Sequence, residues 1–322
     1  MPAGNPRIAI IGAGMCGLTA AISLAPHADV TVFEKSRGLG GRMSTRRHDQ
    51  FMFDHGASFF TVDSPEFAEF IEQRTDVVSE WLPAMQAGAL ERAERTYVCS
   101  PTMNALVKQM ANGVKVVTQT EVAARQQRHN QLWSLSDTHN NHLGQFDWLV
   151  CTAPPLQTLQ LLGDYLPTPS KLRRVNMRPV HSLMLGLSTD WAERWDIQLP
   201  FSSLIDRVVI DSEKPGRTGC GTSVTVQTIS TWSELRLDYE PASLADAIWK
   251  NLSNVVGLTL DDVVHRSVHR WRYALVDRMT VAPMQFDDEL RVVAGGDWSE
   301  GNSVEDAWKA GRAIAAAILD AL

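Results

Sequence analysis

The stretch Arg7–Gly17, RIAIIGAGMCG, places a G-x-G-x-x-G motif directly after a short run of β-branched and small apolar residues. The run Arg7–Ile11 is typical of a strand that is buried on both faces. Small and apolar residues continue from Leu18 to Ala25 and predict a helix, and Pro26 lies beyond it. A strand, a glycine-rich turn and a helix in this order are the context in which the motif binds the phosphates of a dinucleotide.

Each glycine of the motif has a physical task in such a turn. Gly12 permits the tight turn, Gly14 lets the backbone approach a pyrophosphate, and Gly17 lets the helix pack closely on the strand. The free N–H groups at the helix start attract phosphates. A second strand is predicted for Asp29–Phe33, and Glu34 follows it, about twenty residues after the motif, where a ribose hydroxyl needs an acceptor. The alternative is a glycine-rich turn in another kind of α/β protein.

A second glycine cluster lies in the stretch Lys35–Arg47, KSRGLGGRMSTRR. Its glycines let another loop approach a ligand closely, and Arg42 can bind phosphate through its planar guanidinium group. A nicotinamide-dependent dehydrogenase domain needs no second cluster here, so a different dinucleotide is favoured. The stretch Phe53–Thr61, FDHGASFFT, is also dense in glycine, small residues and aromatics. The alternative for the basic stretch is a solvated loop.

Together, AIIGAGMCGLTAA, VFEKSRGLGGRMSTRR and FDHGASFFT resemble the FAD-binding N-terminus of the amine-oxidase-like flavoproteins, and among these the renalase and bacterial renalase-like family. The length of 322 residues fits that family, since mono- and polyamine oxidases usually have a larger substrate domain. The resemblance implies non-covalent FAD. The motifs and the resemblance predict that FAD is contacted by Gly12, Ala13, Gly14, Met15, Cys16, Gly17, Glu34, Lys35, Gly41, Arg42, His55, Gly56, Ala57, Val122, Gly296, Asp297, Gly301, Ser303 and Val304.

The stretch Gly295–Ser303, GGDWSEGNS, lies between a predicted strand, Leu290–Ala294, and a long helical pattern. In the resembled family, a Gly-Asp loop near the C-terminus approaches FAD, and the next helix points its N-terminus at the flavin pyrimidine. Ser303 and Asp306 match an S-x-x-[DE] cap signal. We expect the glycines to clear space, the positive helix end to stabilise reduced flavin, and Asp297 to accept hydrogen bonds from the ribityl chain or the backbone. The alternative is a plain turn with a helix cap.

The middle of the chain has a different pattern. Val122, in VTQTEVAAR, resembles the position where the family holds adenine through backbone contacts, and Trp148–Thr152 is a predicted strand. Met184–Ser188 and Ser223–Ser230 alternate polar and apolar residues, as antiparallel strands do, while Leu244–Leu252 and Leu260–Val264 are expected to supply helical and apolar segments. The predicted fold class is α/β, with a discontinuous Rossmann-like FAD-binding domain (1–70, 96–155 and 277–322) and an inserted α+β substrate domain with a mostly antiparallel sheet (71–95 and 156–276).

Composition limits the functional classes. The chain is 44% hydrophobic and 21% charged, which is typical of a globular protein, and its net charge of −7 gives no case for nucleic acid. Its cysteines, Cys16, Cys99, Cys151 and Cys220, contain no C-x-x-C pair, so neither a zinc site nor a disulfide framework is expected. Reduced thiols indicate the cytoplasm. No apolar run is long enough for a membrane span, and no metal is expected.

The resemblance implies an activity. Renalase-like enzymes oxidise the 2- and 6-dihydro isomers of NAD(P)H to NAD(P)⁺, and O₂ then yields hydrogen peroxide. For this reaction the catalytic candidates are His55, Phe59, Trp271, Tyr273 and His181, with Arg270 or Arg272 available for an amide or a phosphate. A lone histidine such as His181 is more often a core or surface residue, and Trp271 also fits an ordinary half-exposed strand.

Three alternatives remain open at this stage. The chain can be another FAD oxidoreductase of the same fold, acting on an amine or a carotenoid-like substrate. It can be a non-catalytic FAD-binding protein that serves as a sensor or partner. A flavin hydroxylase is a weaker alternative, because such enzymes are usually longer and lack the GGRMSTRR pattern. In each case the expected partners are small molecules, with neither nucleic acid nor membrane.

Overall fold

A computed structural model describes residues 5–85, 95–123, 127–129, 131–191, 195–198, 201–218 and 221–322. The chain forms two compact units. Unit 1 comprises Met1–Gly41, Val107–Asn176 and Val276–Leu322, and unit 2 comprises Arg42–Leu106 and Met177–Leu275. The predicted domain limits differ from these units at residues 42–70, 96–106 and 156–176 and at Val276. Residues 86–94 and Cys220 lie outside the described part. The domain limits stay a prediction, because a compact unit is defined by its internal contacts and not by the cofactor it binds.

The core of unit 1 is a six-stranded sheet in the order β18-β19-β12-β1-β2-β8. Strand β1 pairs in parallel with both neighbours, so that Ala9 lies opposite Thr31 and Leu149. Only β18, at the edge, runs antiparallel to its neighbour. The strands are β1 (Arg7–Ile11), β2 (Asp29–Phe33), β8 (Lys115–Val117), β12 (Trp148–Cys151), β18 (Gln285–Asp287) and β19 (Val292–Ala294).

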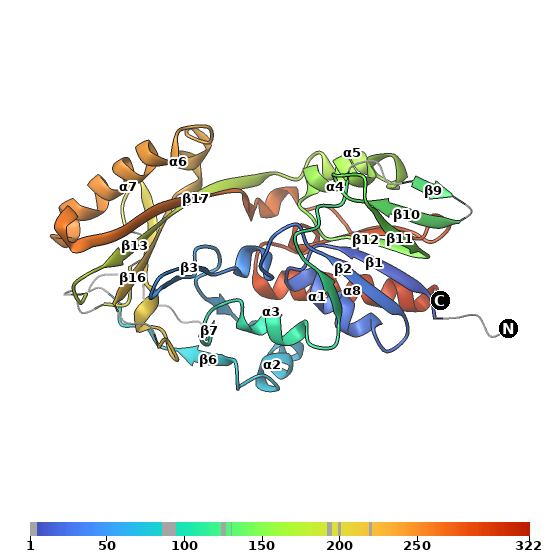
Figure 1. The fold of residues 1–322 in the computed structure, drawn as a ribbon, viewed down its shortest axis with the longest axis horizontal. Coiled ribbons are helices and arrows are strands. Elements are labelled where there is room, and N and C mark those ends of the chain that lie inside the picture. The colour runs from blue at the N-terminus through green and yellow to red at the C-terminus, as the bar shows by residue number, and fades with distance from the viewer. Residues whose placement is uncertain are drawn as a thin grey trace. The chain divides into compact units, whose positions relative to one another are not determined.

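Two helices of unit 1, α1 (Met15–Leu24) and α8 (Val304–Asp320), pack against each other (Figure 1). Their axes approach closely at Gly311, where an added Cβ would lie 2.4 Å from the carbonyl oxygen of Cys16. Unit 1 also contains α4 (Pro155–Leu162), η2 (Gly163–Tyr165), α5 (Pro169–Leu172), β9 (Gln127–His129), β10 (Leu132–Ser136), β11 (His142–Phe146), η5 (Arg278–Thr280) and η6 (Asp297–Ser299). The chain passes between the units four times: at η1 (Gly41–Met43), at α3 (Ala105–Met110), after Asn176 and after Leu275.

The core of unit 2 is a five-stranded sheet in the order β14-β15-β16-β13-β17. Strand β16 runs antiparallel to both β13 and β15. The strands are β13 (Met177–Leu187), β14 (Ile197–Gln198), β15 (Ile205–Ile210), β16 (Thr222–Thr228) and β17 (Val263–Val276). The other elements of unit 2 are β3 (Arg46–His48), β4 (Phe51–Phe53), β5 (Phe60–Thr61), α2 (Pro65–Glu72), β6 (Val78–Trp81), β7 (Thr96–Cys99), η3 (Asp211–Glu213), α6 (Ser230–Glu234), α7 (Pro241–Val256) and η4 (Leu260–Asp262).

The two faces of this sheet have different partners, because side chains alternate along a strand. Leu183 and Val226 belong to the apolar core that includes Ile248 of α7. Met184, the next residue on β13, packs instead with Phe51 and Phe53 of β4. We call these the α7 face and the β4 face. The close fit on the β4 face depends on Gly186, where a Cβ would lie 2.7 Å from the Phe51 ring.

The predicted fold class is confirmed: unit 1 has the parallel sheet and helices of a Rossmann-like fold, and unit 2 has an antiparallel sheet. The strands Arg7–Ile11 and Asp29–Phe33 are confirmed residue for residue. The first helix begins at Met15, before the predicted Leu18, because Gly14 already acts as its N-cap. The predicted helical segment Leu244–Leu252 lies within α7, whereas Leu260–Asp262 forms only a short 3-10 helix and Val263 and Val264 already belong to β17.

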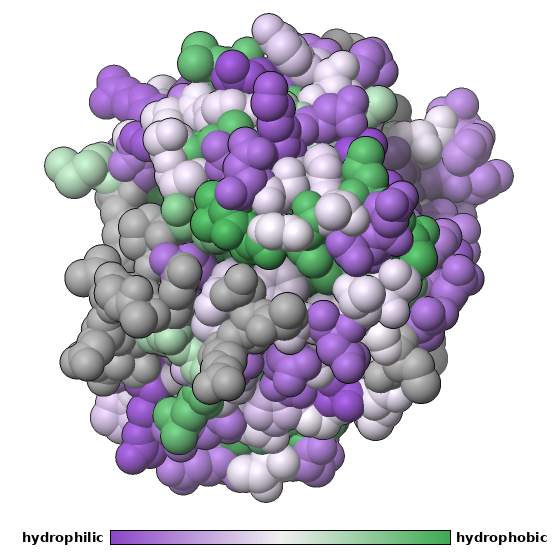
Figure 2. Space-filling model, turned by 90° about the vertical axis from the view of Figure 1, so that its left-hand side faces the viewer, coloured by the Kyte–Doolittle hydropathy of each residue, from purple (hydrophilic) through white to green (hydrophobic). Residues whose placement is uncertain are grey.

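On the side drawn in Figure 2, the coloured hydrophobic residues lie in groups among hydrophilic ones. Single exposed apolar side chains such as Leu82 and Met279 are normal for folded proteins. Within the described residues, every helix is too short or too polar to cross a lipid bilayer.

Candidate functional site

The first glycine loop has the geometry that its sequence predicts. Gly12 adopts a φ of +107°, and its N–H donates to the carbonyl oxygen of Phe33 at 2.8 Å. A Cβ on Gly17 would lie 2.0 Å from the carbonyl oxygen of Gly12, so only glycine lets α1 pack this closely on β1. A Cβ on Gly14 would meet no protein atom within 4 Å. Protein packing therefore explains Gly12 and Gly17, and leaves Gly14 facing open space.

The N-terminus of α1 can hold an anion. Gly14 is its N-cap and supplies no side-chain acceptor, and the first turn contains no acidic residue. The first N–H groups of a helix have no acceptor within the helix, and they carry partial positive charge. Met15 and Cys16 have buried side chains, so their backbone groups are what they can offer to a ligand. An uncapped helix start beside an open glycine fits the pyrophosphate of FAD.

Glu34 organises this loop from the end of β2. Its carboxylate oxygens accept hydrogen bonds from the N–H groups of Ala13 at 2.9 Å and Ser36 at 2.8 Å. A carboxylate has about four lone-pair sites, so Glu34 keeps capacity for the ribose hydroxyl that the sequence analysis assigned to it.

The second glycine cluster lies against the first. The N–H of Gly40 donates to the carbonyl oxygen of Ala13 at 2.9 Å, and a Cβ on Gly41 would lie 3.6 Å from the Cα of Gly14. Gly41 has a φ of +52°, which favours glycine. Lys35 is exposed. The predicted contacts Gly41 and Gly14 are thus neighbours in space within unit 1.

Val122 is placed so that its peptide groups are turned away from the neighbouring strand. It forms an isolated antiparallel bridge with Asp137. The bonds of this bridge come from the flanking residues: Ala123 N–H donates to Ser136, and Thr138 N–H donates to Glu121. In such a pair the N–H and C=O of the opposed residues point outward. This geometry is compatible with the backbone contact to adenine that the resemblance implies.

Close packing within the protein explains why glycine is needed at three positions of the C-terminal loop. A Cβ on Gly295 would lie 3.1 Å from the Ile314 side chain, and one on Gly296 would lie 2.7 Å from the Trp298 indole nitrogen. A Cβ on Gly301 would collide with the Asp306 carboxylate. The expectation that these glycines clear space for flavin is therefore not needed to explain them.

The start of α8 carries less positive charge than the sequence argument assumed. Ser303 and Asp306 form the predicted capping box: the Ser303 hydroxyl accepts from Asp306 N–H, and the Asp306 carboxylate accepts from Ser303 N–H, both at 2.9 Å. Glu305 and Asp306 both lie in the first turn, where their negative charges offset the helix dipole. Asp297 is buried, and its carbonyl oxygen accepts from the N–H groups of Glu300 and Gly301. The contribution of α8 to flavin binding stays a prediction.

In unit 2 the structure brings His55, His269 and Trp271 together, and we call these three residues the imidazole–indole cluster. The ring centroids of His55 lie 4.7 Å from His269 and 5.1 Å from Trp271. Burial, followed by His269 and Arg46, lowers the pKa of His55 to about 3. Burial, followed by Arg46, lowers the pKa of His269 to about 4. Both imidazoles are therefore neutral at physiological pH, and His55 Nδ1 has no partner among the described residues.

The backbone at His55 is held firmly against the β4 face of the sheet. Its carbonyl oxygen accepts from Ser182 Oγ at 2.7 Å, Trp271 Nε1 at 2.7 Å and Gln227 Nε2 at 3.3 Å. The predicted contacts Gly56 and Ala57 lie close to Arg42: Ala57 N–H donates to the Arg42 carbonyl oxygen at 2.7 Å, and a Cβ on Gly56 would overlap that oxygen.

The other candidates lie elsewhere in unit 2. His181 is on the α7 face, fully buried, with its ring edge-on to Trp232. Arg270 donates to the Tyr239 carbonyl oxygen, and Arg272 pairs with Asp238. The structure therefore separates His181 and these two arginines from Trp271, which is on the opposite face of β17.

The centroid of the Phe59 ring lies 6.2 Å from that of Trp81 and 5.7 Å from the guanidinium carbon of Arg207. Tyr273 is two positions beyond Trp271 on β17 and so shares its face. Arg42 donates through Nη1 to the Ala274 carbonyl oxygen at 3.1 Å, which occupies one of its five N–H groups.

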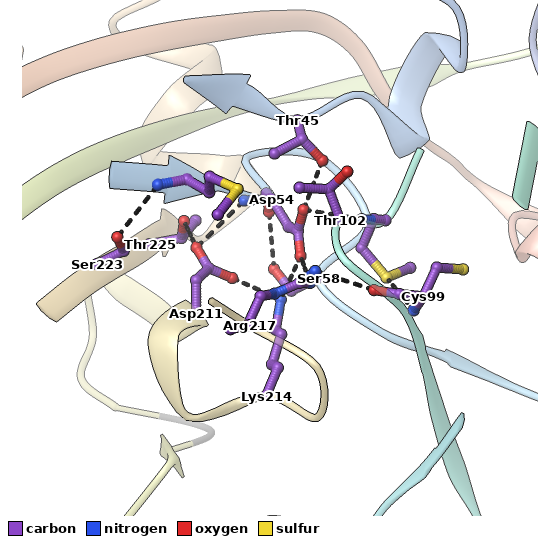
Figure 3. Close-up of polar contacts among 12 residues, drawn as sticks. Thr45, Asp54, Ser58, Cys99, Thr102, Asp211, Lys214, Arg217, Ser223 and Thr225 are labelled. Carbon is purple, nitrogen blue, oxygen red and sulfur yellow. Dashed lines mark hydrogen bonds and ion pairs between the residues drawn. The ribbon is translucent and has the colours of Figure 1, made fainter. Parts of the chain in front are cut away.

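Sequence reasoning missed a group of buried charges around Asp54, the residue before His55 in the chain (Figure 3). Lys214 Nζ lies 2.9 Å from Asp54 Oδ2 and 2.5 Å from Asp211 Oδ1, and Arg217 pairs with Asp54 as well. All four side chains are at least 96% buried. Lys214 follows Asp54 by 160 residues, and the KPGR stretch that contains it carries no known motif. The one available signal was an aspartate immediately before His55 in a stretch dense in glycine, small residues and aromatics.

Comparison with known proteins supports the assignment of the fold and cofactor. Residues 10–74 match the model of an NAD(P)-binding Rossmann-like domain, and residues 86–319 match the model of the flavin containing amine oxidoreductases. Among curated proteins, 4,4'-diapophytoene desaturases of Staphylococcus aureus strains MRSA252 and Newman are each 38% identical over 79 residues. That match covers 21% of this chain and only 16% of each desaturase.

Two solved structures are similar over nearly the whole chain. One, from Exiguobacterium sp. 255-15, is described provisionally as a protoporphyrinogen oxidase; it has a TM-score of 0.77, 12% identity, and coverage of 98% of this chain and 99% of that one. The other is an oxidoreductase from Methanosarcina mazei, with a TM-score of 0.70, 12% identity, and coverage of 96% and 99%. At this identity the likeness shows the fold alone.

Proposed function

Since this chain belongs to the family of flavin-containing amine oxidoreductases and is an FAD-dependent oxidoreductase, we propose that its substrates are isomeric dihydronicotinamide dinucleotides, the 2- or 6-dihydro forms of NAD(P). The substrate loses a hydride and becomes aromatic NAD(P)⁺. In the overall balance, one dihydro isomer, one O₂ and one proton give NAD(P)⁺ and hydrogen peroxide. When bound, FAD would supply the hydride acceptor and the redox link to O₂.

The dinucleotide part of FAD fits unit 1. The uncapped start of α1 and the open space at Gly14 receive the pyrophosphate, and Glu34 receives the adenosine ribose. We include the Val122 backbone, the second glycine loop around Gly41 and the α8 start in the proposed cofactor contacts. The attachment is proposed to be non-covalent, because no cysteine follows Cys220 in the sequence.

The observation that carries the substrate proposal is the charge around the imidazole–indole cluster. His55 and His269 are neutral, and the Arg46 guanidinium lies 3.4 Å from His269 Nδ1. A fixed cation repels a protonated amine and attracts the phosphates of a dinucleotide. The nearest carboxylate along the chain, Asp54, is already paired with Lys214 and Arg217. These features favour a planar ring carrying phosphates over an ammonium group.

In this proposal the cluster binds the reacting ring. Trp271 offers its indole surface, fixed by the bond from Nε1 to the His55 carbonyl oxygen at 2.7 Å. His55 Nδ1 bonds the substrate carboxamide. Tyr273 extends the same face of β17. Such groups orient the ring and exclude water, which is the main task of a protein that assists hydride transfer. His181 lies on the opposite face of the unit 2 sheet, so we do not include it, and Phe59 stays a candidate.

Anaerobic titration of the purified holoenzyme tests the proposal. Micromolar 2- or 6-dihydroNAD is expected to bleach the visible flavin absorbance stoichiometrically, while ordinary 4-dihydroNAD and benzylamine are expected to leave it unchanged. Bleaching by benzylamine, or by an apolar polyene such as the substrates named for the staphylococcal relatives, would replace the proposal with the corresponding alternative. A yellow protein that none of these compounds reduces would be the non-catalytic FAD-binding protein.

A further inference from the structure

The four buried charges beside His55 form a closed, balanced set, which we call the ion network: Asp54, Asp211, Lys214 and Arg217. Two carboxylates oppose two cations. Hydroxyl groups complete it, with Thr45 Oγ1 donating to Asp54 Oδ1 at 2.6 Å and Thr225 Oγ1 donating to Asp211 Oδ2 at 2.5 Å. The carboxylates and cations are thus bonded to one another and to hydroxyl groups, so we do not assign a ligand to the ion network.

The ion network is joined directly to the peptide that carries His55. Asp211 Oδ2 accepts from the Asp54 N–H at 3.2 Å, and the Asp54 carbonyl oxygen accepts from Ser58 Oγ at 3.2 Å. At the next residue, three side chains donate to the His55 carbonyl oxygen, and Gln227 Nε2 also donates to the Gly56 carbonyl oxygen. The segment 54–56 is therefore held by the ion network at Asp54 and by side chains of the sheet at His55 and Gly56.

Stability alone is a poor reason for such an arrangement. Burying four charges has a large desolvation cost, and replacing buried ion pairs by apolar residues of similar volume is often neutral or stabilising. Charged hydrogen bonds, in contrast, are short and directional. A set of them on one peptide restricts where the next side chain can lie. Here the next side chain is the His55 ring, 5.1 Å from Trp271.

We propose that the ion network positions His55: Asp54, oriented by Asp211, Lys214 and Arg217, fixes the 54–56 peptide so that the imidazole stays packed against Trp271 and His269. Asp54 is thus a positioning residue, not a catalytic one. The expected effect of the ion network on the rate of substrate oxidation rests on the proposed function. Its structural content, the place of the His55 ring, is independent of any substrate.

The titration of His55 in the FAD-bound protein separates positioning from simple electrostatics. The Asp54 charge by itself raises the pKa of His55. An Asp54→Asn variant that lost only this charge would therefore have an even lower His55 pKa. If the ring instead leaves its buried place, water stabilises the imidazolium and the pKa rises toward the ordinary 6.5. The two mechanisms predict shifts of opposite sign.

The measurement is proton NMR of the imidazole C–H resonances between about pH 5 and 8, with His55 assigned by its absence in His55→Gln. We expect wild-type His55 not to titrate in this range and Asp54→Asn to titrate in it. Thr225→Val, which removes one bond to Asp211 without changing charge, serves if Asp54→Asn does not fold, and the same upward shift is expected. The matched control is Ile248→Ala, which creates a cavity on the α7 face and should lower stability without moving the His55 titration.

Two results would overturn the proposal. One is a His55 titration in the folded variants that is unchanged or shifted downward. The other is an equal upward shift in Ile248→Ala, which would mean that general loosening exposes His55. With an active holoenzyme, Asp54→Asn should also bleach at least tenfold more slowly with the same FAD content. If wild type is not bleached at all, the proposed function fails, while the titration still decides the positioning role.

Discussion

Replacing Gly14 by alanine tests whether the first glycine loop receives a pyrophosphate. A Cβ at this position meets no protein atom within 4 Å, and the φ of −86° is one that alanine adopts without strain. The lower entropy of the unfolded alanine chain stabilises by roughly 0.4–1 kcal/mol, and the loss of a good N-cap residue costs a similar amount. The apoprotein should therefore unfold within about 1 kcal/mol of wild type.

FAD binding should respond quite differently. The new methyl group would lie where the pyrophosphate approaches the first N–H groups of α1. A hydrogen bond to a charged group contributes roughly 1.5–3 kcal/mol, so the loss of one or two costs about 3 kcal/mol. With a tenfold change for about each 1.4 kcal/mol, the dissociation constant of FAD should rise roughly 100-fold.

Calorimetric titration of flavin-free protein with FAD measures this change, and urea unfolding of the same samples measures apoprotein stability. Gly163→Ala is the matched control, because its Cβ also meets no protein atom within 4 Å but lies in η2, outside the proposed site. Its FAD affinity should equal that of wild type. If Gly14→Ala bound FAD with a dissociation constant within about threefold of wild type, the assignment of this loop to the pyrophosphate would be refuted.

Two further predictions concern stability. Ser303→Ala removes the hydroxyl that accepts from Asp306 N–H; it should cost about 1 kcal/mol and lower the melting temperature by about 2–4 °C in calorimetry, and an unchanged melting temperature would contradict the role of this cap. His181→Leu removes a fully buried imidazole whose ring nitrogens have no partner among the described residues. Because burial and Arg270 lower the folded-state pKa of His181 to about 4 from 6.5, the unfolded chain binds the extra proton between these values, and stability falls as the pH drops through them. Between pH 7.5 and 5, urea unfolding should show wild type losing about 2 kcal/mol more than His181→Leu; equal losses would show that His181 is not buried as a neutral ring.

The imidazole–indole cluster shows why catalytic candidates were hard to choose along the chain. Trp271 and His55 are 216 residues apart, yet they share a hydrogen bond. Arg270 and Arg272 flank Trp271 in the sequence and were candidates to bind an amide or a phosphate. Because side chains alternate along β17, both arginines lie on the α7 face, opposite Trp271. The resemblance identified the motif, while the strand register decided which of its side chains lie together.

What the sequence determined by itself is local. The strand at Arg7–Ile11, the helix that follows it and the cap at Ser303 depend on neighbouring residues, because turn geometry, period and capping act over a few positions. The tertiary structure alone decided that Asp54 meets Lys214 and Arg217, that His181 lies on the far face of its sheet, and that Gly56 is needed beside the Arg42 carbonyl. These contacts join segments that are far apart in the chain. Neither segment has a sequence pattern that indicates which other segment it will contact.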